Sequence, residues 1–325
     1  MIRVADGGFS TTVQDGGRFG MYHIGMPPSG ALDDYSFRAA NLLVGNDETA
    51  AVLETTYTGP TLEFEQDGLV AVTGAEMPPV IDGGEHPLWE AFPVKAGQTL
   101  AFGTLRAGAR CYVAVGGGFD VPDVLGSKST YTLTGLGGYK GRKLAAGDEV
   151  SVGSPPPGSE RRAGRAIDEG LRPTLSGSAE LRTIPGLCSY RVKPDSMRDF
   201  LQSEWVVAPA ADRVGYRFRG IELEFVEREP PFGAGSDPSN VVDLGYPIGS
   251  IQVPGGVEPI VLLNDAVTGG GYATIGTVIS PDRDRLAQTR THGKTRFDPV
   301  SLEQALQARA DRSRRLDRLR EQLTA

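Results

Sequence analysis

The chain has 325 residues, of which 39% are hydrophobic and 23% charged, and its formal net charge is −8. This length suits two domains better than one. The negative charge argues against a nucleic-acid partner, because binding to a phosphate backbone normally needs a basic face. The 44 glycines and 23 prolines indicate many tight turns, which short strands need and long helices do not.

Several common motifs are absent from the sequence. Cys111, Cys188 and three scattered histidines lack the spacing of zinc ligands or of a disulfide framework. The first residues do not have the pattern of a signal peptide, and no window of about 20 apolar residues occurs. GxxxxGK[ST], GxGxxG after a strand and GxSxG are absent too. The sequence therefore predicts a cytoplasmic protein without a metal site or a membrane-spanning segment.

The predicted elements begin with a helix over 33–45, where apolar residues have helical spacing and Gly45 provides a stop. Strands are predicted where residues rich in Val, Ile, Leu and aromatics are bounded mostly by Gly, Pro, Asp or Asn. These segments are 69–74, 109–117, 147–153, 180–186, 220–226 and 259–265. Their short spacing favours barrels or sandwiches over alternating βαβ units.

A linker is predicted over 153–178, which carries four prolines and few large apolar residues. The last predicted element is a helix over 298–323, where Ser301 and Gln304 form a capping box. We expect this helix to be exposed and partly packed on the body. The expected domains are an N-terminal β-barrel over 1–155, a C-terminal β-barrel over 179–300 and the C-terminal helix over 301–325.

The densest group of polar residues lies at 9–64, where glycines interrupt them repeatedly. Loops of this kind bring backbone N–H groups close to a ligand and can form an anion nest. The same turns could instead simply close a barrel, with Asp15 and Asn46 bonding to their own turns.

Two further segments carry charged residues beside turns. In DRVGYR, Arg213 and Arg217 could clamp a carboxylate or phosphate, or one of them could pair structurally with Asp212. Asp265 follows an apolar run and precedes three glycines. That position suits a site carboxylate or an Asx-turn.

Four blocks of the sequence resemble one protein family. The runs TTVQDGGRFG, GMPPSGALD, ANLLVGN and LETTYTGPTLEF are similar to the opening of the family of 5-oxoprolinase C subunits. This family is also called allophanate hydrolase subunit 2-like, and it includes the carboxyltransferase region of urea carboxylase. Similar blocks follow at 112–148, 208–220 and 251–288. The resemblance implies a mainly β fold of two tandem cyclophilin-like β-barrel domains, with a few short helices and a C-terminal helix.

The resemblance also implies an activity and partners. The chain would be part of an ATP-dependent 5-oxoprolinase, which opens a small anionic lactam and also contains relatives of the A and B subunits of 5-oxoprolinase. ATP would be bound by the complex, and not necessarily by this chain. No AMKM-like segment is present, so biotin would not be attached here. The alternatives are the carboxyltransferase component of a biotin-dependent, urea-type carboxylase and a non-enzymatic regulatory binding module.

Candidate site residues follow from the polar clusters and the resemblance together. Catalytic roles are expected for Asp265, Arg217 and Tyr272. Binding of substrate or of an anion is expected for Arg18, Asp33, Asn46, Ser127, Arg213, Tyr216, Gln252 and Thr268.

One block departs from the pattern of carboxyltransferases. Members with that activity usually read LLADRQTTGGYPKIATV, whereas this chain reads LLNDAVTGGGYATIGTV. Ala266, Val267 and Thr274 therefore stand where Arg, Gln and Lys are usual. A lysine ammonium suits a carboxylated intermediate, so its absence weakens the carboxyltransferase interpretation, unless Arg213 or Arg217 supplies the charge.

Overall fold

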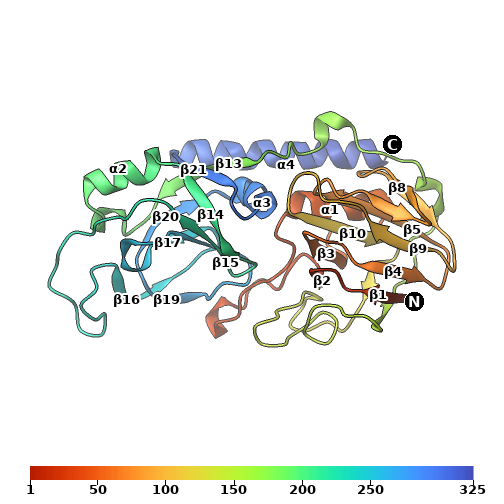
Figure 1. Ribbon diagram of the computed structural model, residues 1–325, viewed down its shortest axis with the longest axis horizontal. Coiled ribbons are helices and arrows are strands. Elements are labelled where there is room, and N and C mark those ends of the chain that lie inside the picture. Colours follow the sequence, from red (N-terminus) through yellow and green to blue (C-terminus); the bar gives the residue numbers. More distant parts are fainter. Residues whose placement is uncertain (325) are drawn as a thin grey trace. The chain divides into compact units, whose positions relative to one another are not determined.

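The computed structural model describes residues 1–324 and confirms the mainly β prediction (Figure 1). The chain forms two compact units. The first contains Met1–Arg18, Ser29–Leu175 and the C-terminal stretch that starts at Ser313. The second contains Phe19–Pro28 and Ser176–Arg312. No helix of the described residues is both long enough and apolar enough to cross a membrane.

The first unit holds two sheets, with strand orders β11-β12-β1-β4-β9-β6-β7 and β2-β3-β10-β5-β8. All strand pairs within them are antiparallel. Their bounds are β1 (Ile2–Asp6), β2 (Ser10–Gln14), β3 (Val52–Thr56), β4 (Thr61–Phe64), β5 (Gly68–Gly74), β6 (Pro79–Ile81), β7 (Gly84–Glu85), β8 (Ala91–Val94), β9 (Thr99–Phe102), β10 (Arg110–Val115), β11 (Phe119–Asp120) and β12 (Glu149–Val152).

Strand β10 shows how the first unit is packed. It lies between β3 and β5, and each of its six residues is buried. Successive side chains of a strand point to opposite faces of the sheet. Cys111 and Val113 accordingly join a core lined by both sheets, whereas Tyr112 and Ala114 join a core beneath helix α1 (Asp34–Val44). A strand covered on both faces explains the continuous apolar run in the sequence.

The two predicted helices are confirmed. Asp33 caps α1 by accepting a hydrogen bond from the Ser36 N–H, and Gly45 ends the helix in the left-handed conformation. Helix α4 (Leu302–Thr324) begins with the predicted reciprocal bonds between Ser301 and Gln304, of 2.8 and 3.2 Å. Its second half contributes three buried leucines to the core beneath α1, and these are Leu316, Leu319 and Leu323.

The second unit is built on a closed barrel with strand order β13-β20-β17-β18-β15-β14-β21. The strands are β13 (Ser178–Pro185), β14 (Trp205–Ala211), β15 (Gly215–Arg219), β17 (Ser250–Gln252), β18 (Ile260–Leu262), β20 (Thr274–Val278) and β21 (Lys294–Pro299). A separate ribbon joins β16 (Asn240–Gly245) to β19 (Gly269–Tyr272). Helices α2 (Pro194–Gln202) and α3 (Ser280–Gln288), which we did not predict, belong to this unit.

The strand predicted at 220–226 is wrong, although its burial alternates as in a strand. Leu223 and Phe225 are buried while the residues between and beside them are exposed. The backbone bonds, however, form only one isolated antiparallel bridge, between Phe225 and Val192. On the other side of the segment, Leu223 N–H donates to the Gly256 carbonyl. A single bridge is not continued into a ladder, so the segment is not a strand.

Candidate functional site

In the first unit, the carboxylate of Asp15 is a centre of hydrogen bonding. It accepts bonds from the hydroxyls of Ser127 and Ser129 (2.6 and 2.5 Å), from the Lys128 N–H (2.5 Å) and from the Gly17 N–H (2.8 Å). The loop at 127–129 is thereby bound to the turn that follows β2. Of these residues, only Ser127 was among the predicted site residues, and its hydroxyl is engaged by Asp15.

Arg18 follows this turn and is almost completely buried. Its Nη2 donates to the Ser129 carbonyl at 2.6 Å, and its Nε lies 3.4 Å from the Val124 carbonyl. Arg18 and Ser127 therefore lie in one cluster around Asp15, as part of the same Gly-rich region. Anion binding by these residues stays a prediction.

Asn46 uses its amide to hold the end of α1. Its Nδ2 donates to Asn41 Oδ1 and to the Val115 carbonyl, and its Oδ1 accepts from the Gly117 N–H at 2.8 Å. These bonds give Asn46 a structural role in this chain, and contact with a substrate stays a prediction.

A second buried network lies beneath α1 and includes the predicted residue Asp33. The Tyr112 hydroxyl accepts from the Asp33 N–H (2.8 Å) and donates to Glu54 Oε2 (2.9 Å), which also accepts from the Leu32 N–H (2.9 Å). Arg110 Nε lies 3.8 Å from Glu54 Oε1. Burial, assisted by the negative charges of Glu54 and Asp33, raises the pKa of Tyr112 well above its usual value. The tyrosine is therefore neutral and serves as a hydrogen-bond bridge.

In the second unit, two predicted residues pair with each other. Arg213 Nε and Nη2 lie 2.8 and 3.2 Å from the two carboxylate oxygens of Asp265, which is 1% exposed. The Asp265 N–H also donates to the Arg213 carbonyl at 3.0 Å. Asp212 instead accepts bonds from the N–H groups of Val214 and Gly215. The guanidinium fork that we expected to clamp a ligand thus engages a carboxylate of the same chain.

Arg217 and Tyr216 differ sharply in their surroundings. Arg217 is exposed on β15 and forms a surface ion pair with Glu258, at 3.3 Å. Tyr216 is buried and points its hydroxyl toward the Ala287 carbonyl of α3, at 3.5 Å. Adjacent residues on a strand face opposite sides, which explains why only Arg217 is available to a molecule in solvent.

Tyr246, which was not predicted, brings Thr268 and Tyr272 together. Its N–H donates to the Thr268 carbonyl (2.8 Å), and its hydroxyl bonds to the Tyr272 N–H and carbonyl (2.7 and 3.0 Å). Burial raises the pKa of Tyr246. Ala266 packs against the same tyrosine. Tyr272 remains 43% exposed and is accessible to solvent.

Gln252 lies opposite Thr274 in the pairing of β17 with β20. Its Nε2 is buried and lacks a hydrogen-bond partner among residues 1–324. The Thr274 carbonyl accepts the N–H of Cys188 at 3.3 Å. Cys188 is part of the wall of a pocket of about 330 Å³ that also contains Arg191 and Arg228. Sequence reasoning missed these arginines because they lie in different segments and form no short motif.

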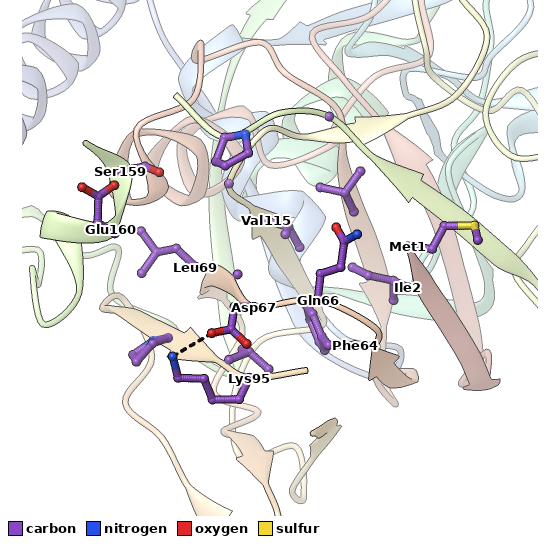
Figure 2. Close-up of a pocket in the computed structure, with 17 residues that line it drawn as sticks. Met1, Ile2, Phe64, Gln66, Asp67, Leu69, Lys95, Val115, Ser159 and Glu160 are labelled. Atoms are coloured by element: carbon purple, nitrogen blue, oxygen red, sulfur yellow. Dashed lines mark hydrogen bonds and ion pairs between the residues drawn. The ribbon is translucent and has the colours of Figure 1, made fainter. Parts of the chain in front are cut away.

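A second pocket, of about 300 Å³, lies in the first unit between the ends of several strands (Figure 2). It contains none of the predicted site residues. Its walls are mostly apolar, and its Lys95 forms an ion pair with Asp67 at 2.8 Å. Within the described part of the chain, no group of three or more His, Cys, Asp or Glu residues is arranged to hold a metal ion.

The chain is a protein of two mainly β units, and one of them is built on a closed barrel. Polar clusters lie on Gly-rich turns of these units. The chain belongs to the carboxyltransferase domain family, subdomains A and B, whose family model matches residues 24–299. It is 39% identical to the C subunit of 5-oxoprolinase from Escherichia coli, over 98% of this chain and 97% of that protein.

Longer relatives contain a region similar to this chain. Urea amidolyase of Saccharomyces cerevisiae is 35% identical over 93% of this chain, which spans only 17% of the yeast protein. The crystal structure of K. lactis urea amidolyase superposes with a TM-score of 0.90 and 32% identity, over 98% of this chain and 20% of that one. These likenesses confirm the resemblance that the sequence motifs indicated.

Proposed function

We propose that this chain is one component of an ATP-dependent enzyme complex that opens 5-oxoproline. The observation that carries this proposal is the end-to-end match with the E. coli protein, in which nearly all of both chains align. The name of that relative designates it as the C subunit of its enzyme, which supports partners that resemble the A and B subunits. ATP is a substrate of the proposed complex.

The proposed reaction needs donors that stabilise negative oxygen atoms. Transfer of the γ-phosphoryl group of ATP to the lactam carbonyl oxygen would release ADP and create a good leaving group on the ring carbon. Attack by water at this carbon would give a tetrahedral intermediate, and its collapse would break the C–N bond with the ring nitrogen leaving as a protonated amine. A second water would then hydrolyse the resulting acyl phosphate to glutamate and phosphate. Arginine side chains and backbone N–H groups stabilise charge in such transition states. Among the predicted catalytic residues, Arg217 is the arginine, and its exposed position on the barrel leaves it available for this task.

The isolated chain is expected to show no ATP-dependent hydrolysis of 5-oxoproline, because no classical constellation around a nucleophile is evident in its sequence. Mixing it with the relatives of the A and B subunits from the same genome should restore glutamate formation. The measurement is the release of glutamate and phosphate with and without each partner. Robust turnover by this chain alone would contradict the requirement for partners.

Replacing Arg217 with alanine is expected to weaken binding of 5-oxoproline by the reconstituted complex. The loss should equal one charge-assisted hydrogen bond, roughly 1.5–3 kcal/mol. The change in free energy of unfolding should stay below about 1 kcal/mol, since the ion pair with Glu258 is on the surface. Arg219→Ala is the matched control, because Arg219 lies two residues along β15 and is also exposed. Equal KM values for the two variants would remove Arg217 from the proposed site.

A carboxyltransferase function is the second candidate, and the structural likeness to K. lactis urea amidolyase favours it. At the three positions of the departing motif, however, this chain has no basic group. Ala266 is packed in an apolar cluster, and Thr274 is buried. Carboxylated biotin and urea should therefore yield no transfer above background in the reconstituted complex. Release of free biotin that depends on urea would instead support the second candidate.

A further inference from the structure

The pocket beside Cys188 in the second unit is lined by both polar and apolar residues. Its volume is about 330 Å³, which is within the range of small-molecule sites. The polar groups come from Arg191, Arg228 and Cys188. The other residues of its wall are Tyr190, Val226, Pro231, Val241 and Val242.

The two guanidinium groups have no negative partner. Arg191 is 6% exposed, and its Nη2 donates to the Pro238 carbonyl. Arg228 donates through Nη2 to the Asn240 carbonyl, and its Nε is buried without a partner. Within residues 1–324, neither arginine forms an ion pair. Buried charges in proteins are normally paired. The buried Arg191, beside the partly buried Arg228, is therefore an exception that needs an explanation.

The electrostatics agree with the geometry. Burial, and then the neighbouring positive charge of Arg228, lower the pKa of Arg191. Two like charges in a partly desolvated pocket repel each other, and an anion placed between them would relieve both the repulsion and the unmet hydrogen bonding.

We propose that this pocket binds a small carboxylate ligand, with its carboxylate on Arg191 and Arg228 and its apolar body against the valines and Pro231. The planar forks of arginine match the two oxygens of a carboxylate. The apolar residues of its wall favour a molecule with carbon surface to bury over a bare inorganic anion. This inference concerns binding by this chain and does not depend on the proposed lactam reaction.

Cys188 provides a direct reporter, because its thiol is within hydrogen-bonding reach of Arg191 and forms part of the pocket wall. Iodoacetate and iodoacetamide both alkylate a thiolate, whose sulfur displaces iodide and forms a bond to the CH₂ carbon. Only iodoacetate carries a carboxylate. The other cysteine, Cys111, is fully buried with its pKa raised to about 12 by burial, so it should stay unmodified near neutral pH.

The full chain would be treated with each reagent, and modification of Cys188 would be followed by mass spectrometry. For Cys188, the rate with iodoacetate divided by the rate with iodoacetamide should be at least about tenfold higher than the same ratio for glutathione. About tenfold is the effect expected from one charge-assisted hydrogen bond to the carboxylate of iodoacetate. Arg228→Gln should lower this ratio by about tenfold, whereas Arg219→Gln, which removes an exposed charge from β15, should not change it. A ratio equal to that of glutathione in the unaltered chain would overturn the proposal without any variant.

Protection experiments identify the ligand chemistry. L-5-Oxoproline should slow carboxymethylation of Cys188, and its uncharged amide at the same concentration should not. Inorganic phosphate should protect less than 5-oxoproline, because it has no apolar surface to bury. Protection by phosphate but not by 5-oxoproline would show that the site is not selective for carboxylates and would refute that part of the proposal. An Arg228→Gln variant that folds and keeps the iodoacetate preference would refute the role of the arginines.

Discussion

Replacing Asp265 with asparagine is expected to lower the free energy of unfolding of the second unit by about 3–5 kcal/mol. Asp265 is buried and binds Arg213 through both carboxylate oxygens. Loss of its charge leaves the largely buried guanidinium without this counter-charge, and desolvation makes that state costly. The pair also joins the turn after β18 to the turn that precedes β15, so local barrel structure should be weakened with it.

Urea denaturation can measure this effect in the second unit alone. The chain has two tryptophans, and Trp205 is buried in the second unit, so a Trp89→Phe background isolates its fluorescence. Glu258→Gln is the matched control, because it breaks the exposed ion pair of Arg217 on the same barrel and should cost less than about 1 kcal/mol. Adding Arg213→Gln to Asp265→Asn should recover part of the loss. Equal effects of the Asp265 and Glu258 variants would contradict the structural importance of the buried pair.

Replacing Leu319 with alanine should destabilise the first unit by about 2–5 kcal/mol. Leu319 has no exposed surface and packs in the core that α1 and Trp89 share with α4. Removing three carbon atoms from this site loses their burial and leaves a cavity. The large effect would show that the end of α4 is part of the core of the first unit.

The measurement uses Trp89 as the reporter, in a Trp205→Phe background, since Trp89 belongs to the same core. Leu306→Ala is the matched control on the same helix, because Leu306 is 46% exposed. We expect this control to change the free energy of unfolding by about 0.5 kcal/mol or less. A Leu319 variant as stable as the control would mean that the helix end is not held in this core.

The limits of helices α1 and α4 are determined locally, and the sequence predicted them well. Asp33, Gly45, Ser301 and Gln304 act on backbone groups within about one helical turn. Buried strands such as β10 are also evident from composition, because a strand covered on both faces requires continuous apolar residues. The segment at 220–226 shows where this reasoning fails, since alternating burial does not specify a neighbouring strand.

The family could likewise be identified from sequence motifs, and the comparisons confirmed it. The partners of the candidate site residues could not be identified in this way. The sequence suggested a ligand clamp or a pair with Asp212 for Arg213, and a site carboxylate or an Asx-turn for Asp265. In the structure, Arg213 and Asp265 pair with each other.

That pairing depends on tertiary structure. Strands β15 and β18 are neighbours in the barrel wall, and their register pairs Gly215 with Leu262. This register places the start of β15 beside the end of β18. Arg191 and Arg228 similarly lie in segments that share a pocket only after the chain has folded. The sequence by itself therefore determined the class of fold, the capped helices and the family. Only the tertiary structure decided which charges are paired and which remain available to a ligand, because ion pairing depends on distances of a few ångströms between residues far apart in the chain.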